Sequence, residues 1–337
     1  MTEKNQANTG IYVWLHAVGV LAFLALATAW GIYQHRPPKA LPGAAPPSLF
    51  SAERAIADIR SFATQPRPAG AAAHAATRDF IVRAIEAAGL QPEIQDTLVH
   101  WRPGYAGRVC NVLARLPGTA NSGAIALMAH YDSVSFGPGA ADDGAGTAAL
   151  LEAMRALKVG PPLKNDVIFL FTDGEEGRLL GGTGCRGARA FVEQHPWAKD
   201  IAVVMNFDCR GTSGPVYMYE TTPGNSRLIA ALAASGCRPM ASSLMYDFYS
   251  RMPVDSDFTI FKKAGFTGLN FAFIDRLTHY HTHLDNPNNL NPDSVQHHGE
   301  YALGLTRYLG NISLADMSGR DVIYFNTIGY HLIQYPM

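Results

Sequence analysis

The longest uninterrupted apolar stretch of the chain lies near its N-terminus. From Ile11 to Tyr33 the sequence contains no Lys, Arg, Asp or Glu and a single histidine, His16. A helix over this stretch is long enough to cross a bilayer about 30 Å thick. A buried helix of a soluble protein normally shows a polar stripe, and this stretch shows none. The pattern therefore predicts one transmembrane helix.

The apolar stretch fits two kinds of targeting segment, an uncleaved signal anchor and a cleavable signal peptide. Ala27-Thr28-Ala29 has the small-x-small form of a cleavage site, which keeps the signal peptide open. We favour the anchor because the stretch is longer than a usual signal-peptide core and Lys4 is the only basic residue before it. Lys4 opposes Arg36 and Lys39, so the charge rule slightly favours a cytoplasmic location for the domain after the stretch.

The hydrophobic pattern divides the chain into four parts. Residues 1–36 form the N-terminal tail and anchor, residues 37–48 a Pro-rich linker, residues 49–315 the main domain, and residues 316–337 an apolar, membrane-proximal tail. In the main domain, helical periodicity alternates with short apolar runs, which is typical of a single α/β domain with a largely parallel sheet. The expected helices are Ser51–Thr64, Ala75–Ala88, Gly144–Leu157, Ala188–Gln194, Ser226–Ser235 and Pro292–Leu309. The expected strands are Ala124–Ala129, Val167–Phe171, Ala202–Phe207 and Leu269–Ile274.

Composition narrows the class of protein. Of 337 residues, 47% are hydrophobic and 16% are charged, which excludes a disordered chain and a polytopic membrane protein. The 27 Lys and Arg nearly balance the 28 Asp and Glu, so the chain is not expected to bind nucleic acid. The cysteines form no Cys-x-x-Cys motif, and in an oxidising compartment they could pair in three ways. They are Cys110, Cys185, Cys209 and Cys237.

Polar side chains follow each of the four expected strands at its carboxyl end. They are His130 and Asp132, then Asp173, Glu175 and Glu176, then Asp208, and finally Tyr280 and His281 a few residues on. The Pro/Gly-rich loop from Gly137 to Gly146 returns Asp142 and Asp143 to the same place. The carboxyl edge of an open parallel sheet is where ligands bind. We therefore expect these side chains to converge on one site.

A convergence of acids at this edge requires cations, because buried like charges raise one another's pKa. A mixture of imidazole and carboxylate indicates zinc. The histidines disfavour calcium and magnesium, and the lack of ligating cysteines disfavours structural zinc. Three carboxylates and two neutral imidazoles supply a charge of −3 against +4 for two zinc ions. A bridging hydroxide would bring the site to neutrality, and it is the nucleophile that a two-metal hydrolase needs.

Five stretches resemble those of the co-catalytic dizinc aminopeptidases, in matching order and spacing. They are MAHYDS at 128–133, PGAADDGAG at 138–146, TDGEEG at 172–177, NFDCRG at 206–211 and YHTHLD at 280–285. FSAERA at 50–55, QHPWAK at 194–199 and SDFTIF at 256–261 resemble the membrane-bound branch with the endoplasmic reticulum metallopeptidase and the vacuolar membrane protease. The resemblance implies a three-layer zinc-exopeptidase fold, with helices on both faces of the sheet.

The resemblance also implies a role for individual residues. The metal ligands would be His130 and Asp208 for one zinc, Glu176 and His281 for the other, and Asp142 as the bridge between the two. Glu175 would be the general base that takes a proton from the bridging water and passes it to the leaving amine. Asp132 would orient the imidazole of His130, and Tyr280 would donate a hydrogen bond to the oxyanion.

Several neighbouring residues receive other expectations. His279, His281 and His283 alternate, so in an extended segment all three would face one way; the Tyr-His-Thr context selects His281, with His283 as the alternative. Asp143 and Asp173 are expected to shape loops. Three further histidines on or beside predicted helices are expected at the surface, namely His195, His297 and His298.

The sequence thus predicts a membrane-anchored, two-zinc exopeptidase that hydrolyses a terminal, most simply N-terminal, peptide bond of a peptide or protein. One alternative is a glutaminyl cyclase of the same fold with a single zinc, although the resembling cyclases carry Asp-Ser where this chain has Asp142-Asp143. Another is an inactive binding ectodomain, disfavoured because no ligand position is substituted. The resemblance favours a lumenal or periplasmic domain. Residues 65–71 depart from the family's pattern, and the chain is either a short member or a piece of a polytopic protein; its oligomeric state is open.

Overall fold

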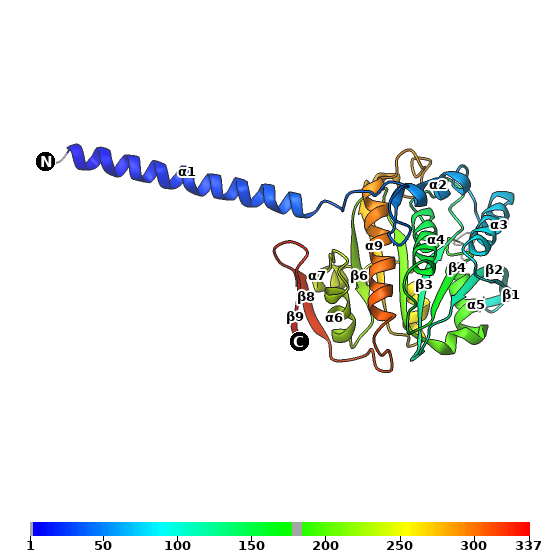
Figure 1. Cartoon of the computed structure of the whole chain (residues 1–337). Coiled ribbons are helices and arrows are strands. Elements are labelled where there is room, and N and C mark those ends of the chain that lie inside the picture. The colour runs from blue at the N-terminus through cyan, green and yellow to red at the C-terminus, as the bar shows by residue number, and fades with distance from the viewer. Residues whose placement is uncertain (1–2, 177–183) are drawn as a thin grey trace. The chain divides into compact units, whose positions relative to one another are not determined.

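The computed structural model describes residues 3–176 and 184–337, in two compact units that comprise residues 1–36 and 37–337 (Figure 1). The first unit is helix α1 (Glu3–Gln34). Its Tyr12–Gln34 segment has a mean hydropathy of 1.9 and is long and apolar enough to cross a membrane. The exposed side chains include Leu21 and Phe23, at 65% and 69%. The predicted N-terminal apolar helix is confirmed, and its insertion in a membrane stays a prediction.

The second unit is built on a seven-stranded sheet in the order β1-β2-β4-β3-β5-β7-β6. Its centre consists of β4 (Val167–Thr172), β3 (Ala124–His130), β5 (Ile201–Cys209) and β7 (Gly268–Asp275). These four strands pair in parallel and are the four that the sequence predicts. The α/β class with a parallel sheet centre is therefore confirmed, and all four strands end at the same edge of the sheet.

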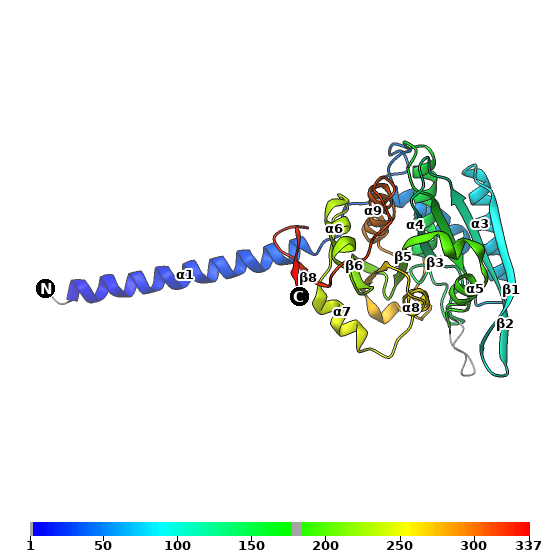
Figure 2. The ribbon, with the colours of Figure 1, turned by 90° about the horizontal axis from the view of Figure 1, so that it is seen from below.

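Helices cover both faces of this sheet, as the alternation of side chains along the strands requires (Figures 1 and 2). Ile125 and Leu127 of β3 pack into a core with α2 (Ala52–Phe62), α4 (Gly144–Lys158), α6 (Ser226–Ala234) and α9 (Pro292–Leu309). Ala126 and Met128 point the other way, into a core with α5 (Arg186–Gln194) and α8 (Asp257–Lys263). The predicted three-layer arrangement is confirmed.

Three strands at the flanks of the sheet were not predicted. Strands β1 (Pro92–Arg102) and β2 (Tyr105–Leu116) form an antiparallel pair next to β4, and β6 (Ser213–Thr221) pairs antiparallel with β7. Strand β1 is an edge strand with polar and half-exposed side chains, and β6 begins with Ser-Gly-Pro. Neither β1 nor β6 has the continuous apolar run of a buried strand, so the hydrophobic pattern alone does not reveal these two strands.

The six expected helices are all present, with ends shifted by at most three residues. Helix α3 (Ala72–Ala87) completes the set. Within the described residues, the structure adds α7 (Ser243–Ser250) and α8, which are short, and the 3₁₀ turns Pro196–Asp200 and Leu277–His279. Within residues 316–337, β8 (Val322–Asn326) and β9 (Leu332–Pro336) form an antiparallel hairpin in which Val322, Tyr324 and Leu332 are buried.

The linker residues lie against helix α9. The backbone N–H of Leu41 donates a 3.0 Å hydrogen bond to Gln296, and that of Ala40 donates one of 2.9 Å to Asp293. The ring of Phe50 fills the space beside Gly299, where a Cβ would come within 2.2 Å of it. Residues 40–52 therefore cover the outer face of α9, while the sheet covers its inner face.

The structure overturns the expectation that His195, His297 and His298 lie at the surface. Their exposed fractions are 6%, 0% and 0%. His297 Nδ1 accepts a hydrogen bond from the N–H of Val216, and its Nε2 donates to Arg238 O. Burial on both faces of α9 lowers the pKa of His297 to about 4 and that of His298 to about 3. Both histidines are thus neutral members of the core.

Candidate active site

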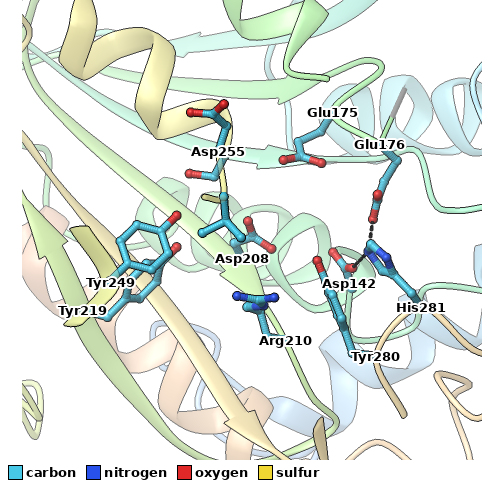
Figure 3. A pocket seen from close by; sticks show the side chains of 12 residues that line it. Asp142, Glu175, Glu176, Asp208, Arg210, Tyr219, Tyr249, Asp255, Tyr280 and His281 are labelled. Carbon is cyan, nitrogen blue, oxygen red and sulfur yellow. Dashed lines mark ion pairs between the residues drawn. The ribbon is translucent and has the colours of Figure 1, made fainter. Parts of the chain in front are cut away.

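The residues predicted to form a site converge on one pocket at the carboxyl edge of the sheet (Figure 3). The pocket has a volume of about 170 Å³, and Asp142, Glu175, Glu176, Asp208 and His281 line it together with Tyr280. His130 is buried, with 3% exposed. Three groups of these side chains have their ligand atoms within 4.8 Å of one another. The groups are His130, Asp142 and Asp208; His130, Glu175 and Glu176; and Asp142, Glu176 and His281.

His130, the last residue of β3, is oriented by its neighbours. Its Nδ1 lies 3.4 Å from Oδ1 of Asp132 and 3.2 Å from the backbone oxygen of the same residue. Its Nε2 therefore points the other way, and lies 3.1 Å from Oδ1 of Asp142. The structure brings Asp132 to the position expected for a residue that orients the imidazole.

Asp132 also positions the acidic loop that follows β4. Its carboxylate accepts hydrogen bonds of 3.1 Å from the backbone N–H groups of Gly174, Glu175 and Glu176. This contact explains how two adjacent acidic residues, usually a solvated turn, are held at the pocket with 7% of Glu175 exposed. Gly177, the last residue of the matching stretch, lies outside the described residues.

The loop after β3 separates the roles of its two adjacent acids, Asp142 and Asp143, whose peptide bond is cis. Asp143 caps α4, since its carboxylate accepts hydrogen bonds from the N–H groups of Gly146 and His130. Asp142 points into the pocket (Figure 3). Asp143 therefore holds the loop, while Asp142 is free to face His130 and His281.

The segment after β7 is not extended, contrary to the expectation for its alternating histidines. Leu277–His279 is a 3₁₀ turn, and His281 has a left-handed φ of 57°. His281 Nε2 lies 2.8 Å from Glu176 and 3.1 Å from Asp142, whereas His283 is exposed and belongs to none of the described ligand groups. The Tyr280 ring stacks on His281, with 3.7 Å between ring centroids.

Two residues that support the site were not singled out from the sequence. Asp285, at the end of the YHTHLD stretch, accepts hydrogen bonds of 2.7 and 3.1 Å from the N–H groups of Ala141 and Asp142. Arg67 is fully buried, and its guanidinium donates to the backbone oxygens of Tyr131, Pro138 and Gly139. The acid at the end of a matched stretch was a usable signal for Asp285. Arg67 lies in residues 65–71, where the departure from the family's pattern hid its role.

The electrostatics of the site indicate a deficit of positive charge. Burial, reinforced by Asp142, raises the pKa of Glu176 to about 7 and that of Asp208 to about 6. Burial also raises the pKa of Glu175 well above its usual value. Burial lowers the pKa of His281, but the adjacent carboxylates of Asp142 and Glu176 outweigh it and raise the pKa to about 10. These groups cannot all be ionised together without cations.

The side chains fit a metal centre by their chemistry and their arrangement. His281 Nε2 and Asp142 Oδ2 lie 3.1 Å apart, yet both are buried atoms without a hydrogen-bond partner. Atoms that face each other in this way suit a shared cation, and two imidazoles with three carboxylates are ligands that zinc accepts.

Comparisons with known proteins agree on the family. Residues 111–306 match the family described as Peptidase family M28. The chain is 31% identical over 241 residues to endoplasmic reticulum metallopeptidase 1 of Rattus norvegicus, covering 69% of this chain and 26% of that protein. It is 33% identical over 225 residues to the vacuolar membrane protease of Candida tropicalis, covering 65% and 24%. The chain therefore spans about a quarter of the length of these relatives.

Solved structures with the same fold include two kinds of enzyme. A glutaminyl cyclase of Porphyromonas gingivalis superposes with a TM-score of 0.63 at 20% identity, covering 77% of this chain and 98% of that chain. A Zn-dependent exopeptidase from Parabacteroides distasonis superposes with a TM-score of 0.61 at 19% identity, with the same coverage. At these identities the likeness concerns the fold.

Proposed function

Because the chain belongs to peptidase family M28, we propose that its domain is a two-zinc aminopeptidase that removes the N-terminal residue of peptides. The observation that carries this proposal is the convergence of two imidazoles and three carboxylates on one buried pocket whose carboxylates outnumber its cations. The side chains lie at the ends of β3 and β5 and in the loops after β3, β4 and β7, at the carboxyl edge of the sheet where an α/β fold places its ligands.

We assign His130 and Asp208 to one zinc ion, Glu176 and His281 to the other, and Asp142 to both. The spatial groups support this assignment, since Asp142 belongs to one group with His130 and Asp208 and to another with Glu176 and His281. Bound zinc would supply Lewis acidity toward the scissile carbonyl and lower the pKa of a coordinated water. Hydrogen bonds of four further residues hold the ligand side chains and their loops in place. These residues are Asp132, Asp143, Asp285 and Arg67.

Glu175 is the proposed general base. As the carbon–nitrogen bond of the peptide breaks and an oxygen–carbon bond forms, its carboxylate takes the proton of the attacking water and delivers it to the leaving nitrogen. Geometry also groups Glu175 with His130 and Glu176, so the division of roles between Glu175 and Glu176 rests on the family resemblance. Tyr280 lines the same pocket, and its hydroxyl is the proposed donor to the oxyanion.

Helix α1 is the proposed membrane anchor. Its apolar segment Tyr12–Gln34 is long enough for a single span, and the chain resembles proteins named for the endoplasmic reticulum and the vacuolar membrane. We propose that the domain faces the lumenal or periplasmic side of that membrane, as the family resemblance implies.

Metal content and product analysis test this function. The full chain, purified in detergent, should contain close to two zinc ions by elemental analysis and should release the N-terminal residue from short peptides. A peptide that begins with Gln serves as the control substrate, because a cyclase closes its N-terminal ring without cleaving the peptide bond. Full activity without a transition metal would refute the metal site, whereas one zinc ion and ring closure would establish the cyclase.

A further inference from the structure

The candidate active site contains a cation that the proposed reaction does not use. Arg210 follows directly on β5, two residues after Asp208, and lines the pocket with the proposed ligands. It is the only Lys or Arg among the described residues of that lining. In Figure 3 its guanidinium lies among Asp208, Tyr280 and the pair Tyr219 and Tyr249.

Arg210 is held in position without a close ion pair among the described residues. Its guanidinium carbon lies 5.1 Å from the centroid of the Tyr280 ring, a contact that fixes the side chain through its face. No carboxylate of the described residues lies within 4.0 Å of its guanidinium nitrogens, although four carboxylates of proposed catalytic residues line the same pocket. Its Nε is buried and has no hydrogen-bond partner among the described residues.

This arrangement favours a role in binding an anion of the substrate. An arginine that served to balance the pocket's acids would be expected to pair with one of them, and three of the carboxylates here are assigned to zinc. A planar guanidinium fork binds carboxylates through two parallel hydrogen bonds. The carboxylate of a dipeptide lies one residue, about 3.5 Å, beyond the scissile bond, so a side chain in the same 170 Å³ pocket can reach it.

An apolar groove continues from the pocket at Arg210. It has a volume of about 510 Å³ and shares Arg210, Tyr219 and Tyr249 with the catalytic pocket. Its far wall is formed by side chains of α7, of the residues just after α7 and of the turn after β7, namely Leu244, Met245, Phe248, Met252 and Leu277. Phe248 and Leu244 are 71% and 69% exposed, which leaves an apolar surface that a bound side chain would cover.

We propose that the site is specific for dipeptides. In the preferred substrate, the residue after the scissile bond carries a free carboxylate and a bulky apolar side chain. Arg210 binds the carboxylate, and the apolar groove receives the side chain. The inference rests on the proposed peptidase function and specifies its substrate class.

Matched substrates test the carboxylate directly. With the zinc-loaded full chain in detergent, kcat/KM is measured for Ala-Phe and for Ala-Phe-amide, which differ only in the charged group. The wild type should prefer the acid by about 10- to 100-fold, the range expected for a charge-assisted hydrogen-bonded pair. Arg210→Met should reduce this ratio to near one, and Arg210→Lys should leave it in between. The control is Arg227→Met, since Arg227 is exposed and pairs with Asp316 away from the pocket.

A second pair of substrates tests whether the apolar groove receives the side chain. Ala-Phe should be cleaved about tenfold or more faster than Ala-Gly, and Phe248→Ser should reduce that preference. Equal kcat/KM for Ala-Phe and Ala-Phe-amide in the wild type, or a ratio that Arg210→Met leaves unchanged, overturns the inference while peptidase function stands. If the zinc-loaded protein cleaves neither these substrates nor longer peptides, the inference and the proposed function both fall.

Discussion

Replacing the buried Arg67 is expected to destabilise the fold more than replacing any exposed arginine. Its guanidinium is fully buried and donates to three backbone oxygens, two of them at 2.8 Å. Its own backbone N–H and O are tied to Ser133. The Arg67→Met variant keeps much of the side-chain length but removes both the donors and the charge.

The structure sets the size of this effect. The variant leaves the carbonyls of Tyr131, Pro138 and Gly139 without these donors, at about 1–3 kcal/mol for each that water cannot reach. It also removes a positive charge near Asp132, Asp142, Asp143 and Asp285. Breaking a buried charged network by removing one partner typically costs about 3–5 kcal/mol. We therefore expect the free energy of unfolding to fall by about 4 kcal/mol.

Urea unfolding of the full chain in detergent, followed by tryptophan fluorescence, measures this change. Arg67→Lys keeps the charge but not the fork, so it should lose about 2 kcal/mol. Arg78→Met is the matched control, because Arg78 pairs with its exposed neighbour Asp79 and should contribute less than about 1 kcal/mol. A loss below 1 kcal/mol for Arg67→Met, equal to that of the control, would refute the view that Arg67 holds the loop from Gly137 to Gly146.

Three further predictions concern the base, a buried histidine and the anchor. Glu175→Gln should lower the rate by about 10²- to 10⁴-fold with zinc retained, whereas Glu176→Gln should lose zinc; equal zinc loss in both would contradict the division of roles. His297 has a pKa of about 4, below its unfolded value of about 6.5, so its contribution is complete above pH 6.5 and is lost as the pH falls toward 4. The destabilisation caused by His297→Gln should therefore shrink by up to about 3 kcal/mol over that window, and a pH-independent difference in urea unfolding would contradict this. The full chain should stay with membranes during carbonate extraction through Tyr12–Gln34, and recovery of a soluble form beginning at Trp30 would instead establish cleavage after Ala29.

The sequence predicts those parts of the fold whose pattern is set by burial on both sides. The strand from Ala124 is continuously apolar because helices cover both faces of the sheet, and such a run can be recognised without a structure. Strand β1 lies at an edge and interrupts its apolar residues with the polar run Gln95-Asp96-Thr97, and α7 has no buried residue at all. Their positions depend on neighbours far away in the chain, so local pattern does not reveal them.

The same division holds at the site. The side chains that face the pocket follow strand ends or lie in a short loop, so their convergence follows from the topology of a parallel sheet. The residues that support these side chains are harder to predict from the sequence. The surface expectation for His297 failed because β6 and the segment at Arg238, both remote in sequence, contact its imidazole. A helix that looks amphipathic in isolation can thus be covered on more than one face by segments far away in the sequence.

The placement of the two unusual arginines follows one electrostatic argument. The pocket gathers more carboxylates than the imidazoles can balance, and zinc ions can neutralise only those whose oxygens they reach. Asp143 and Asp285 turn their oxygens toward backbone N–H groups instead, so their charge must be balanced from behind the loop, where Arg67 is buried. Arg210 lies on the open side of the same pocket, within 4.0 Å of no described carboxylate. A cation behind the ligands stabilises the empty site, whereas one in front has its charge available for a substrate, and substitution of each should therefore separate stability from specificity.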